Sequence, residues 1–289
     1  MAGDGGAPSD AAALLASATA TLRERTADLA AARLEAELLL AHVLGVGRER
    51  LLTLATVPAP AAQAFERDVA ERARTGRPVA YFVGRRGFLE FELAVDARVL
   101  VPRPESELII EVLDELLASG ALPRGPLVDR GTGSGNLALG VRGRRPVLAL
   151  DVSVAALEVA AGNLSALLPR ARRLLVRADG LSCLRPASVA AVLANPPYVE
   201  PDEFARLPDD VRRHEPAIAL VPGEGSARAM FTRLLGEARA VLRPGGWLIT
   251  EVGAGQAPWV AELASVLGFG WTDVRRDLAG IERVVAARR

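Results

Sequence analysis

The fold is decided by residues 188–198, which read SVAAVLANPPY. The first seven of these residues carry no charge and are largely apolar, a composition typical of a buried strand in a parallel sheet. The strand must end at the two prolines, because proline has no backbone N–H to donate to a neighbouring strand. Ligands of open α/β sheets bind at the carboxyl ends of the strands. We therefore expect Asn195, which follows the strand directly, at a ligand site.

The four residues Asn195, Pro196, Pro197 and Tyr198 have the chemistry of a slot for a small planar group that carries an NH2. The Asn195 carboxamide offers both an acceptor and donors. The Pro-Pro step holds a backbone carbonyl rigidly, and Tyr198 supplies a flat ring beside it. On this tetrapeptide alone, the alternative is a plain turn that ends a strand, with asparagine as a turn residue.

A second strand runs into a glycine-rich turn at residues 127–135, LVDRGTGSG. Glycine tolerates positive φ and lets the backbone approach a ligand closely. Gly131, Gly133 and Gly135 alternate, whereas the dinucleotide fingerprint needs its third glycine after two intervening residues. This spacing and the later Asn-Pro-Pro-Tyr favour S-adenosylmethionine over NAD as the cofactor.

Acidic residues follow the next two predicted strands. Asp151 comes directly after residues 147–150, and Asp179 follows residues 174–176. An acid at the end of the second strand suits the vicinal hydroxyls of a ribose, and Asp179 is placed for an adenine edge. The β-α-β-α-β order predicts a doubly wound α/β sheet that binds an adenosine-type cofactor.

The hydrophobic period changes along the chain and divides it into three predicted parts. Before residue 76, apolar residues recur at three-to-four spacing, after a Gly-rich start at residues 1–10 that we expect to be disordered. Residues 79–83 and 88–95 are predicted to be the strands of a hairpin. The parts are a helical domain at 1–76, a β-hairpin linker at 77–101 and a cofactor-binding domain at 102–289.

Later segments complete the predicted site and sheet. Residues 199–226 are rich in proline and charge, and we interpret them as one wall of the substrate site or, alternatively, as a solvated insertion. Glu251, in the strand predicted at 247–252, faces either the site or solvent. Residues 271–275 and 283–287 are expected to form an antiparallel hairpin at the edge of the sheet.

Composition and charge argue against several classes of function. At 289 residues, with 50% hydrophobic and 24% charged residues, the chain has ample material for a globular core. Its formal net charge of +0 argues against non-specific nucleic-acid binding, which needs a basic surface. Cys183 is the one cysteine, so no intrachain disulfide is possible, and the spacing of His42 and His214 does not suit a zinc site. We expect no metal.

The sequence also argues against a membrane protein. No uncharged apolar stretch approaches the roughly 18 residues that a membrane span needs. Residues 11–20 are apolar, but no lysine or arginine precedes them as in a secretory signal, and we interpret them as a helix. We expect a cytoplasmic protein that is a monomer and contacts neither membrane nor nucleic acid directly.

On these residues the chain resembles the release factor glutamine N5-methyltransferases, the HemK family. The resemblance runs from the helical region to the C-terminus, and it is strongest at Pro102–Glu107, Gly131–Gly135, Asn195–Tyr198, Glu215–Pro216 and Asp277–Gly280. The Asn-Pro-Pro-Tyr motif alone is shared with DNA and RNA amino-methylating enzymes. The Pro-Arg-Pro-Glu segment and the helical region make the match more specific, although the family usually has threonine at Ser106.

The resemblance implies a class I, Rossmann-like methyltransferase: a doubly wound, mostly parallel seven-stranded sheet with a small N-terminal helical domain that helps to dock a release factor. The reaction implied is methyl transfer from S-adenosylmethionine to the side-chain amide nitrogen of the glutamine in the release factor's Gly-Gly-Gln. The implied cofactor-binding residues are Gly131, Thr132, Gly133, Ser134 and Gly135 at the methionine end, Asp151 at the ribose, Asp179 and Gly180 at the adenine, and Asn195.

A mechanism follows as a hypothesis from the weak nucleophilicity of an amide nitrogen. The Asn195 side-chain oxygen and the Pro196 carbonyl would accept the two N–H bonds of the substrate amide, and Tyr198 would pack on its plane. Pro197 would complete the substrate-binding residues.

The sequence departs from the family at three positions near this predicted site. Arg130 stands where an aliphatic residue is usual, so its charge is expected to reach solvent or to pair, for example with Asp129 or Glu105. Asn136 replaces a small apolar residue, and Gly180 replaces a larger side chain.

Alternative functions therefore stay open. They are an amino-methyltransferase that acts on another protein or on nucleic acid, and a cofactor-binding module that has lost catalysis. The zero net charge argues against nucleic acid as the substrate, and Arg130 is the motive for considering lost catalysis.

Overall fold

The computed structural model describes residues 7–26, 28–143, 145–170, 172–223 and 225–289. The chain divides into two compact units. The first comprises residues 1–84 and 208–214, and the second comprises residues 85–207 and 215–289. Each unit has a hydrophobic core of its own. The first six residues of the tail that the sequence predicts to be disordered lie outside the described residues.

The first unit is built from helices around an apolar core. Its helices are α1 (Ala11–Leu22), α2 (Leu29–Leu44), α3 (Ala59–Thr75), α4 (Val79–Val83) and α9 (Asp209–His214), with 3-10 turns η1 (Arg23–Arg25) and η2 (Arg48–Thr53). Asp10 and Asp28 cap α1 and α2, because each side chain accepts a bond from the backbone N–H three residues later. Leu22, Leu39 and Phe65 are fully buried in this core.

Two short stretches of the first unit differ from the sequence prediction. Ser9–Asp10 (β1) pairs with Thr56–Val57 (β2), so the predicted disordered start is ordered at its end. Val79–Val83 forms α4, and the prediction of a strand there is wrong. Pro78 precedes the first turn and Gly84, at φ 71°, ends it. An apolar run this short between proline and glycine has no periodicity that separates helix from strand.

The hairpin lies in the second unit, and its strands differ from the predicted ones. β3 (Arg85–Phe88) pairs with β4 (Phe91–Ala94). The turn between them contains Leu89, a non-glycine residue at φ 50°, whose backbone N–H donates to Glu107 Oε1 at 2.8 Å. Hairpin rules look for glycine or asparagine at positive φ, so they place the turn at the nearby glycines instead.

The second unit is built on a seven-stranded sheet in the order β10-β11-β9-β8-β5-β6-β7. Its strands are β5 (Leu127–Arg130), β6 (Val147–Asp151), β7 (Arg173–Arg177), β8 (Val189–Ala194), β9 (Leu242–Glu251), β10 (Trp271–Arg276) and β11 (Glu282–Arg288). The strands from β9 to β7 run parallel, and β11 and β10 form an antiparallel edge. The predicted mostly parallel sheet and its closing hairpin are confirmed.

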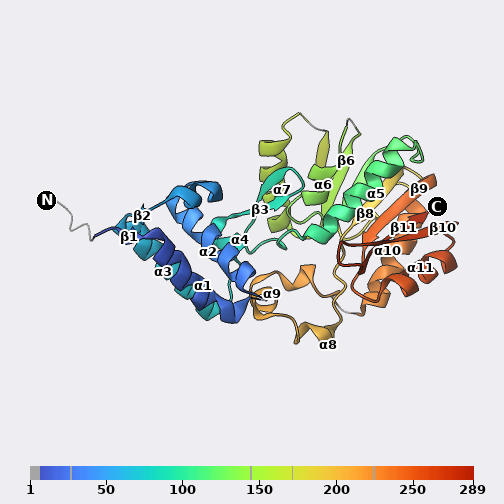
Figure 1. The fold of residues 1–289 in the computed structure, drawn as a ribbon. Coiled ribbons are helices and arrows are strands. Elements are labelled where there is room, and N and C mark those ends of the chain that lie inside the picture. Colours follow the sequence, from blue (N-terminus) through green and yellow to red (C-terminus); the bar gives the residue numbers. More distant parts are fainter. Residues whose placement is uncertain (1–6, 27, 144, 171, 224) are drawn as a thin grey trace. The chain divides into compact units, whose positions relative to one another are not determined.

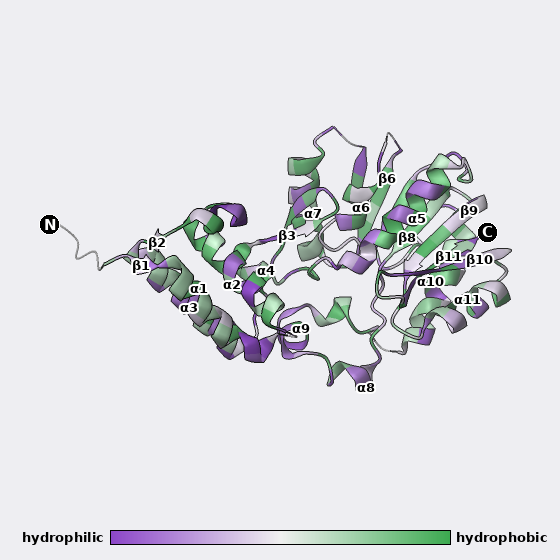
Figure 2. Ribbon diagram, viewed as in Figure 1, coloured by the Kyte–Doolittle hydropathy of each residue, from purple (hydrophilic) through white to green (hydrophobic). Residues whose placement is uncertain are grey.

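Helices cover the sheet on both faces (Figure 1). α5 (Glu107–Ala118), α6 (Asn136–Gly140) and α7 (Val154–Leu167) contact one another in order, and α10 (Ala227–Val241) packs with α11 (Ala257–Val266). Hydrophobic residues follow the central strands, whereas the helices mix hydrophobic and hydrophilic residues (Figure 2). No described helix of either unit is long and apolar enough to cross a membrane.

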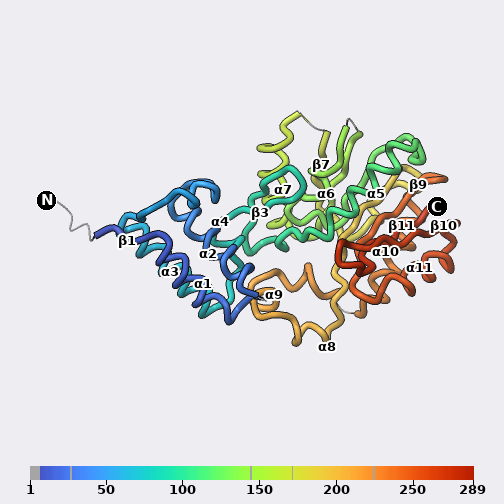
Figure 3. The backbone as a smooth tube through the Cα atoms, viewed as in Figure 1, coloured from blue at the N-terminus to red at the C-terminus, as the bar shows by residue number. Residues whose placement is uncertain are grey.

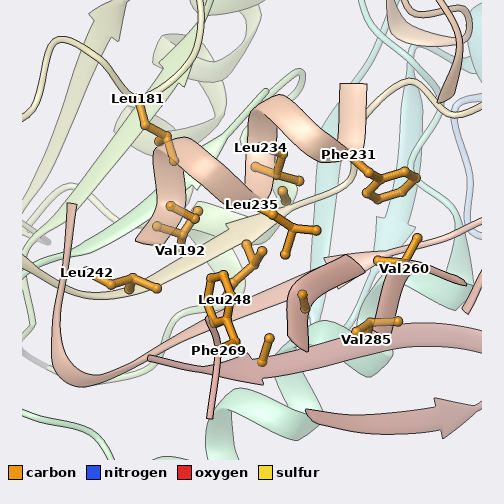
Figure 4. Close-up of a cluster of buried hydrophobic side chains, with 14 of the residues drawn as sticks. Leu181, Val192, Phe231, Leu234, Leu235, Leu242, Leu248, Val260, Phe269 and Val285 are labelled. Atoms are coloured by element: carbon orange, nitrogen blue, oxygen red, sulfur yellow. The ribbon is translucent and has the colours of Figure 1, made fainter. Parts of the chain in front are cut away.

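The core of the second unit joins the sheet to α10 and α11 (Figure 4). Phe231 and Leu235 of α10 lie in one cluster with Val192 of β8 and Leu248 of β9. All six residues of β8 are buried, as expected for a central strand of a parallel sheet. Because β8 pairs with β5 on one side and β9 on the other, the residue after it lies at the middle of the carboxyl edge.

The segment 199–226 is not the irregular loop that its composition predicts. It contains α8 (Pro201–Phe204), α9 and η4 (Ala217–Ala219), and the tube in Figure 3 follows the backbone through them from β8 to α10. The α9 portion is grouped with the helical unit, where His214 Nε2 lies 2.9 Å from the carbonyl oxygen of Thr75.

Candidate active site

A cavity of about 510 Å³ lies in the second unit, at the carboxyl ends of β5, β6 and β8. Its lining includes most of the residues that the sequence assigns to the site: Gly131, Thr132, Gly133, Ser134, Asp151, Asp179, Gly180, Asn195 and Pro197. The lining found among the described residues does not include Gly135, Pro196 or Tyr198. Ile218 and Pro222 also line it, so part of the 199–226 segment borders the cavity.

The glycine turn after β5 is tied to the end of β6. Gly131 and Gly133 have φ values of 75° and 53°, which glycine adopts without strain. The backbone N–H groups of Gly131 and Thr132 both donate to the carbonyl oxygen of Leu150 at 2.8 Å. Gly133 N–H donates to Asp151 Oδ2 at 2.9 Å. Asp151 therefore holds the turn in place at the edge where the sequence expects a ribose.

Asn163 of α7 holds the glycine turn through hydrogen bonds of its side-chain amide. Its side-chain NH2 donates to the carbonyl oxygens of Ser134 and Ala94, both at 2.9 Å, and its Oδ1 accepts from Ala94 N–H at 2.8 Å. Gly135 does not line the cavity but packs against α7, where a Cβ on this residue would lie 3.4 Å from the Cβ of Ala160. The turn is thus joined to the hairpin strand β4 through one buried amide.

Replacing Asn163 by leucine is expected to lower the free energy of unfolding by about 2 kcal/mol, because it leaves the buried carbonyl oxygen of Ser134 and the partly buried backbone groups of Ala94 without their partner. Urea denaturation measures this loss. Ser165→Ala, at an exposed position of the same helix, is the control and is expected to change little. Equal stability of Asn163→Leu and Ser165→Ala would contradict the role of the buried amide.

The register of two parallel strands places Glu251 beside Asn195. Ala194 of β8 pairs with Thr250 of β9, so the next residue of each strand lies at the same edge. Asn195 Nδ2 donates to Ser106 Oγ at 3.0 Å, and Ser106 Oγ donates to Glu251 Oε2 at 2.5 Å. Ser106 is the last residue of the 3-10 turn η3 (Pro104–Ser106), which precedes α5.

Tyr198 does not line the cavity, and both its hydroxyl and its backbone carbonyl are hydrogen-bonded. Its OH donates to Glu251 Oε1 at 3.0 Å, and its backbone carbonyl accepts from Gln256 Nε2 at 3.0 Å. Burial and the neighbouring Glu251 raise the pKa of the Tyr198 hydroxyl, so the hydroxyl keeps its proton at neutral pH. Glu251 is 2% exposed, so it does not face solvent, and it is not among the described lining residues of the cavity either; its carboxylate contacts Ser106 and Tyr198 instead.

The opposite rim of the cavity is organised around Arg233 of α10. Its Nη1 lies 3.1 Å from Asp179 Oδ1, and its Nη2 donates to the carbonyl oxygen of Asp179 at 2.7 Å. Arg233 Nε also donates to Glu237 Oε1 at 2.8 Å. A Cβ at Gly180, which has φ 86°, would lie 2.4 Å from Glu237 Oε2, so a larger side chain here would require the Glu237 side chain to shift.

Comparison with known proteins connects both parts of the chain to one family. A model described as the PrmC N-terminal domain matches residues 13–84, and one described as the methyltransferase small domain matches residues 104–207. The release factor glutamine methyltransferase of Nitratidesulfovibrio vulgaris is 38% identical over 274 residues, which cover 92% of each chain. The chain belongs to the release factor glutamine methyltransferase family.

Further relatives agree with this assignment. The release factor glutamine methyltransferase of Cereibacter sphaeroides is 39% identical over 259 residues, which cover 88% of this chain and 90% of the relative. A methyltransferase from Pyrococcus furiosus has a similar structure, with a TM-score of 0.51 and 16% identity over 78% of this chain and 98% of that one. At that identity the likeness shows the fold alone, and it supports the predicted class I methyltransferase sheet.

Among the departures from the release factor glutamine methyltransferase pattern, Arg130 and Asn136 both line the cavity. Within the described residues, Arg130 makes no ion pair, so the suggested pairing with Asp129 or Glu105 is wrong. Its Nη1 lies 3.8 Å from Met230 Sδ, and burial lowers the pKa of its guanidinium. No group of three described His, Cys, Asp or Glu side chains is arranged to hold a metal ion.

Asp129, one residue before Arg130, is completely buried under the glycine turn. Its Oδ2 accepts from Thr132 Oγ1 at 2.6 Å and from Ala138 N–H at 3.0 Å, and no described donor reaches its Oδ1. Burial raises the pKa of Asp129 to about 7, although these two hydrogen bonds favour the ionised form.

The pKa of Asp129 predicts a pH dependence of stability. Between about pH 4 and the folded-state pKa of about 7, the folded chain holds a proton that the unfolded chain has released. The free energy of unfolding is therefore expected to fall as the pH rises through this window, and the contribution is lost above it. Thermal melts at about pH 5 and about pH 8 test this, because Asp129→Asn should lower the pH dependence. An equal decline in wild type and Asp129→Asn would contradict the assignment.

The motif patterns of the sequence missed Ser106, Asn163 and Gln256 as supports of the site. Each is an ordinary polar residue outside the glycine turn and the Asn-Pro-Pro-Tyr motif. Strand register could have identified Glu251, because two neighbouring parallel strands that end together bring Asn195 and Glu251 to one edge.

Proposed function

We propose that this protein transfers the methyl group of S-adenosylmethionine to the side-chain amide nitrogen of a glutamine in a peptide chain release factor. Its membership of the release factor glutamine methyltransferase family supports the substrate. The observation that carries the chemistry is the Asn195 amide. Its Nδ2 is bound to Ser106, which leaves Oδ1 as an acceptor beside a cavity that also contains the glycine turn.

The cavity fits the proposed cofactor in size and in chemistry. Its volume of about 510 Å³ lies within the range of small-molecule sites. Ser134, in the glycine turn, lines the cavity, and its buried Oγ has no described partner, which suits an ammonium or carboxylate group of the cofactor nearby. When bound, S-adenosylmethionine supplies a methyl group on a positively charged sulfur.

Roles for the other lining residues follow from their places. The glycine turn, residues 131–135, would bind the methionine end with backbone groups, and Asp151 would accept from the ribose hydroxyls at the end of β6. Asp179 and Gly180 would lie at the adenine edge, where Arg233 fixes the Asp179 carboxylate. The release factor would be docked in part by the helical unit, residues 1–84.

The substrate amide needs orientation, because its nitrogen lone pair is delocalised into the carbonyl. We propose that Asn195 Oδ1 accepts one N–H bond of the glutamine amide and the Pro196 carbonyl oxygen accepts the other. No described donor occupies either oxygen. Pro196 is itself buried, so its carbonyl is held on a rigid backbone. Tyr198 would pack on the amide plane, and the extra proton of the methylated amide would pass to water.

Label transfer from tritiated S-adenosylmethionine tests the substrate class. We expect label on a purified bacterial release factor and none on a variant release factor whose Gly-Gly-Gln glutamine is replaced by asparagine. Label on duplex DNA or RNA instead would overturn the assignment in favour of a nucleic-acid methyltransferase. Cofactor binding in calorimetry without transfer to the release factor would indicate a module without this activity.

A further inference from the structure

A chain of hydrogen bonds links the end of β9 to the amide that we propose as the substrate acceptor. Ser106 Oγ donates to Glu251 Oε2 at 2.5 Å and accepts from Asn195 Nδ2 at 3.0 Å. Glu251 Oε1 accepts from Tyr198 OH at 3.0 Å. Glu251 and Ser106 are 2% and 1% exposed, so water does not compete for these bonds.

The direction of each bond follows from what each group can donate. An ionised carboxylate only accepts, and a hydroxyl has one hydrogen to give. Glu251 therefore takes the hydrogens of both Ser106 and Tyr198. Ser106 Oγ is left as an acceptor, and the neighbouring Asn195 amide can satisfy it only with its NH2 group. The oxygen of that amide is then turned away from Ser106, and no described residue donates to it.

We propose that Glu251 is a positioning residue that, through Ser106, holds the Asn195 amide with Oδ1 toward the substrate. The inference rests on the proposed function, in which this oxygen accepts an N–H bond of the glutamine. Glu251 is not part of the described cavity lining, so it acts through its neighbours. In the reverse orientation Asn195 would present its own NH2 to the NH2 of the substrate, and two donors would face each other.

Glu251→Gln tests the proposal with little change of shape. Ser106 and Tyr198 donate to different oxygens of the Glu251 carboxylate, and a glutamine side chain has an oxygen at only one of those two places and an NH2 group at the other. We expect kcat for release factor methylation to fall about 30-fold, less than for a group in direct contact with the substrate. The KM for S-adenosylmethionine should stay within about twofold, because the cofactor lining is unchanged. Glu262→Gln, on the exposed side of α11, is the matched control.

Ser106 tests the same link at its other end. Ser106→Ala removes the hydroxyl and is expected to lower kcat about tenfold, again with little change of KM for the cofactor. Ser106→Thr restores a hydroxyl at the same place and is expected to recover most of the rate. If threonine and alanine at this position were equally slow, bulk rather than the hydroxyl would matter, and the link through Ser106 would be wrong.

The pH profile separates positioning from a purely structural role. The groups that face Glu251 are Ser106 and Glu105 of η3, Tyr198, and Arg283 of β11. Burial raises the pKa of Glu251, and so does Glu105, whereas the bonds from Ser106 and Tyr198 and the charge of Arg283 lower it; the net pKa is raised. We expect kcat to fall on the acid side as Glu251 takes up a proton, and this limb to be absent in Glu251→Gln.

A measurement without turnover decides the amide orientation itself. The chain contains three asparagines, so selective ¹⁵N labelling gives three side-chain NH2 signals, and Asn195→Ala assigns one of them. In wild type the Asn195 NH2 should be protected from hydrogen exchange by its bond to Ser106, and Glu251→Gln and Ser106→Ala should reduce that protection. Unchanged protection in Glu251→Gln, or a kcat within about threefold of wild type, would overturn the proposal.

The two kinds of failure are distinguishable. If wild type transfers no methyl group to any release factor, the proposed function fails, and the exchange measurement still tests the orientation of Asn195. If wild type is active and Glu251→Gln is equally active, the function stands and Glu251 has no positioning role.

Discussion

Replacing Asn195 by alanine is expected to lower kcat about 100- to 1,000-fold, the loss typical of an oriented group that acts in the transition state. The variant removes the oxygen that we propose to accept an N–H bond of the substrate amide. The cofactor should bind almost as well, because the glycine turn and Asp151 are held by bonds that do not involve Asn195. The Kd for S-adenosylmethionine is therefore expected to change by less than about threefold.

Single-turnover kinetics and calorimetry measure these two quantities separately for Asn195→Ala. Asn195→Asp keeps an oxygen at the same place but cannot donate to Ser106, and we expect it to lie between wild type and alanine. Equal losses of turnover and cofactor affinity in Asn195→Ala would mean that the residue mainly binds the cofactor, and the proposed mechanism would be wrong.

Replacing Asp151 by alanine is expected to weaken S-adenosylmethionine binding about 100-fold, the equivalent of two lost hydrogen bonds to a charged group. The variant removes the proposed acceptor of the ribose hydroxyls. It also releases Gly133 N–H, which donates to Oδ2 at 2.9 Å, and Ser153 N–H, which donates to Oδ1 at 2.9 Å. The glycine turn would then lose its link to the end of β6.

Calorimetric titration with S-adenosylmethionine measures the effect of Asp151→Ala. Asp151→Asn keeps one oxygen and is expected to lose about tenfold in affinity. A Kd within about threefold of wild type for Asp151→Ala would show that neither the ribose contact nor the support of the turn depends on this carboxylate.

Much of the frame could be predicted from the sequence because buried parallel strands have a simple signature. The run before Asn195 is uniformly apolar, and it forms β8, in which every residue is buried. The glycine turn follows β5, whose first three residues are buried, and Asp151 ends β6; the structure brings them to one cavity with Asn195. A residue at the carboxyl end of a parallel strand lies at the ligand-binding edge of the sheet, so its position in the sequence is sufficient to predict its place in the site.

The missed features depend on contacts between distant segments. Leu89 adopts positive φ, and its backbone N–H donates to Glu107, eighteen residues later; no local rule describes such a turn. Ser106 and Glu251 are 145 positions apart in the chain and share a hydrogen bond. Arg130 was expected to reach solvent or to pair with a carboxylate, and its guanidinium lies beside Met230 of α10. Each of these outcomes is set by tertiary packing rather than by local pattern.

Fragment-ion mass spectrometry of a release factor, after incubation with this protein and S-adenosylmethionine, locates any transferred methyl group. We expect a gain of one methyl group on the side chain of the Gly-Gly-Gln glutamine, present with wild type and strongly reduced with Asn195→Ala. A methyl group on any other residue, or an equal yield from Asn195→Ala, would show that the proposed transfer to this glutamine through Asn195 is wrong.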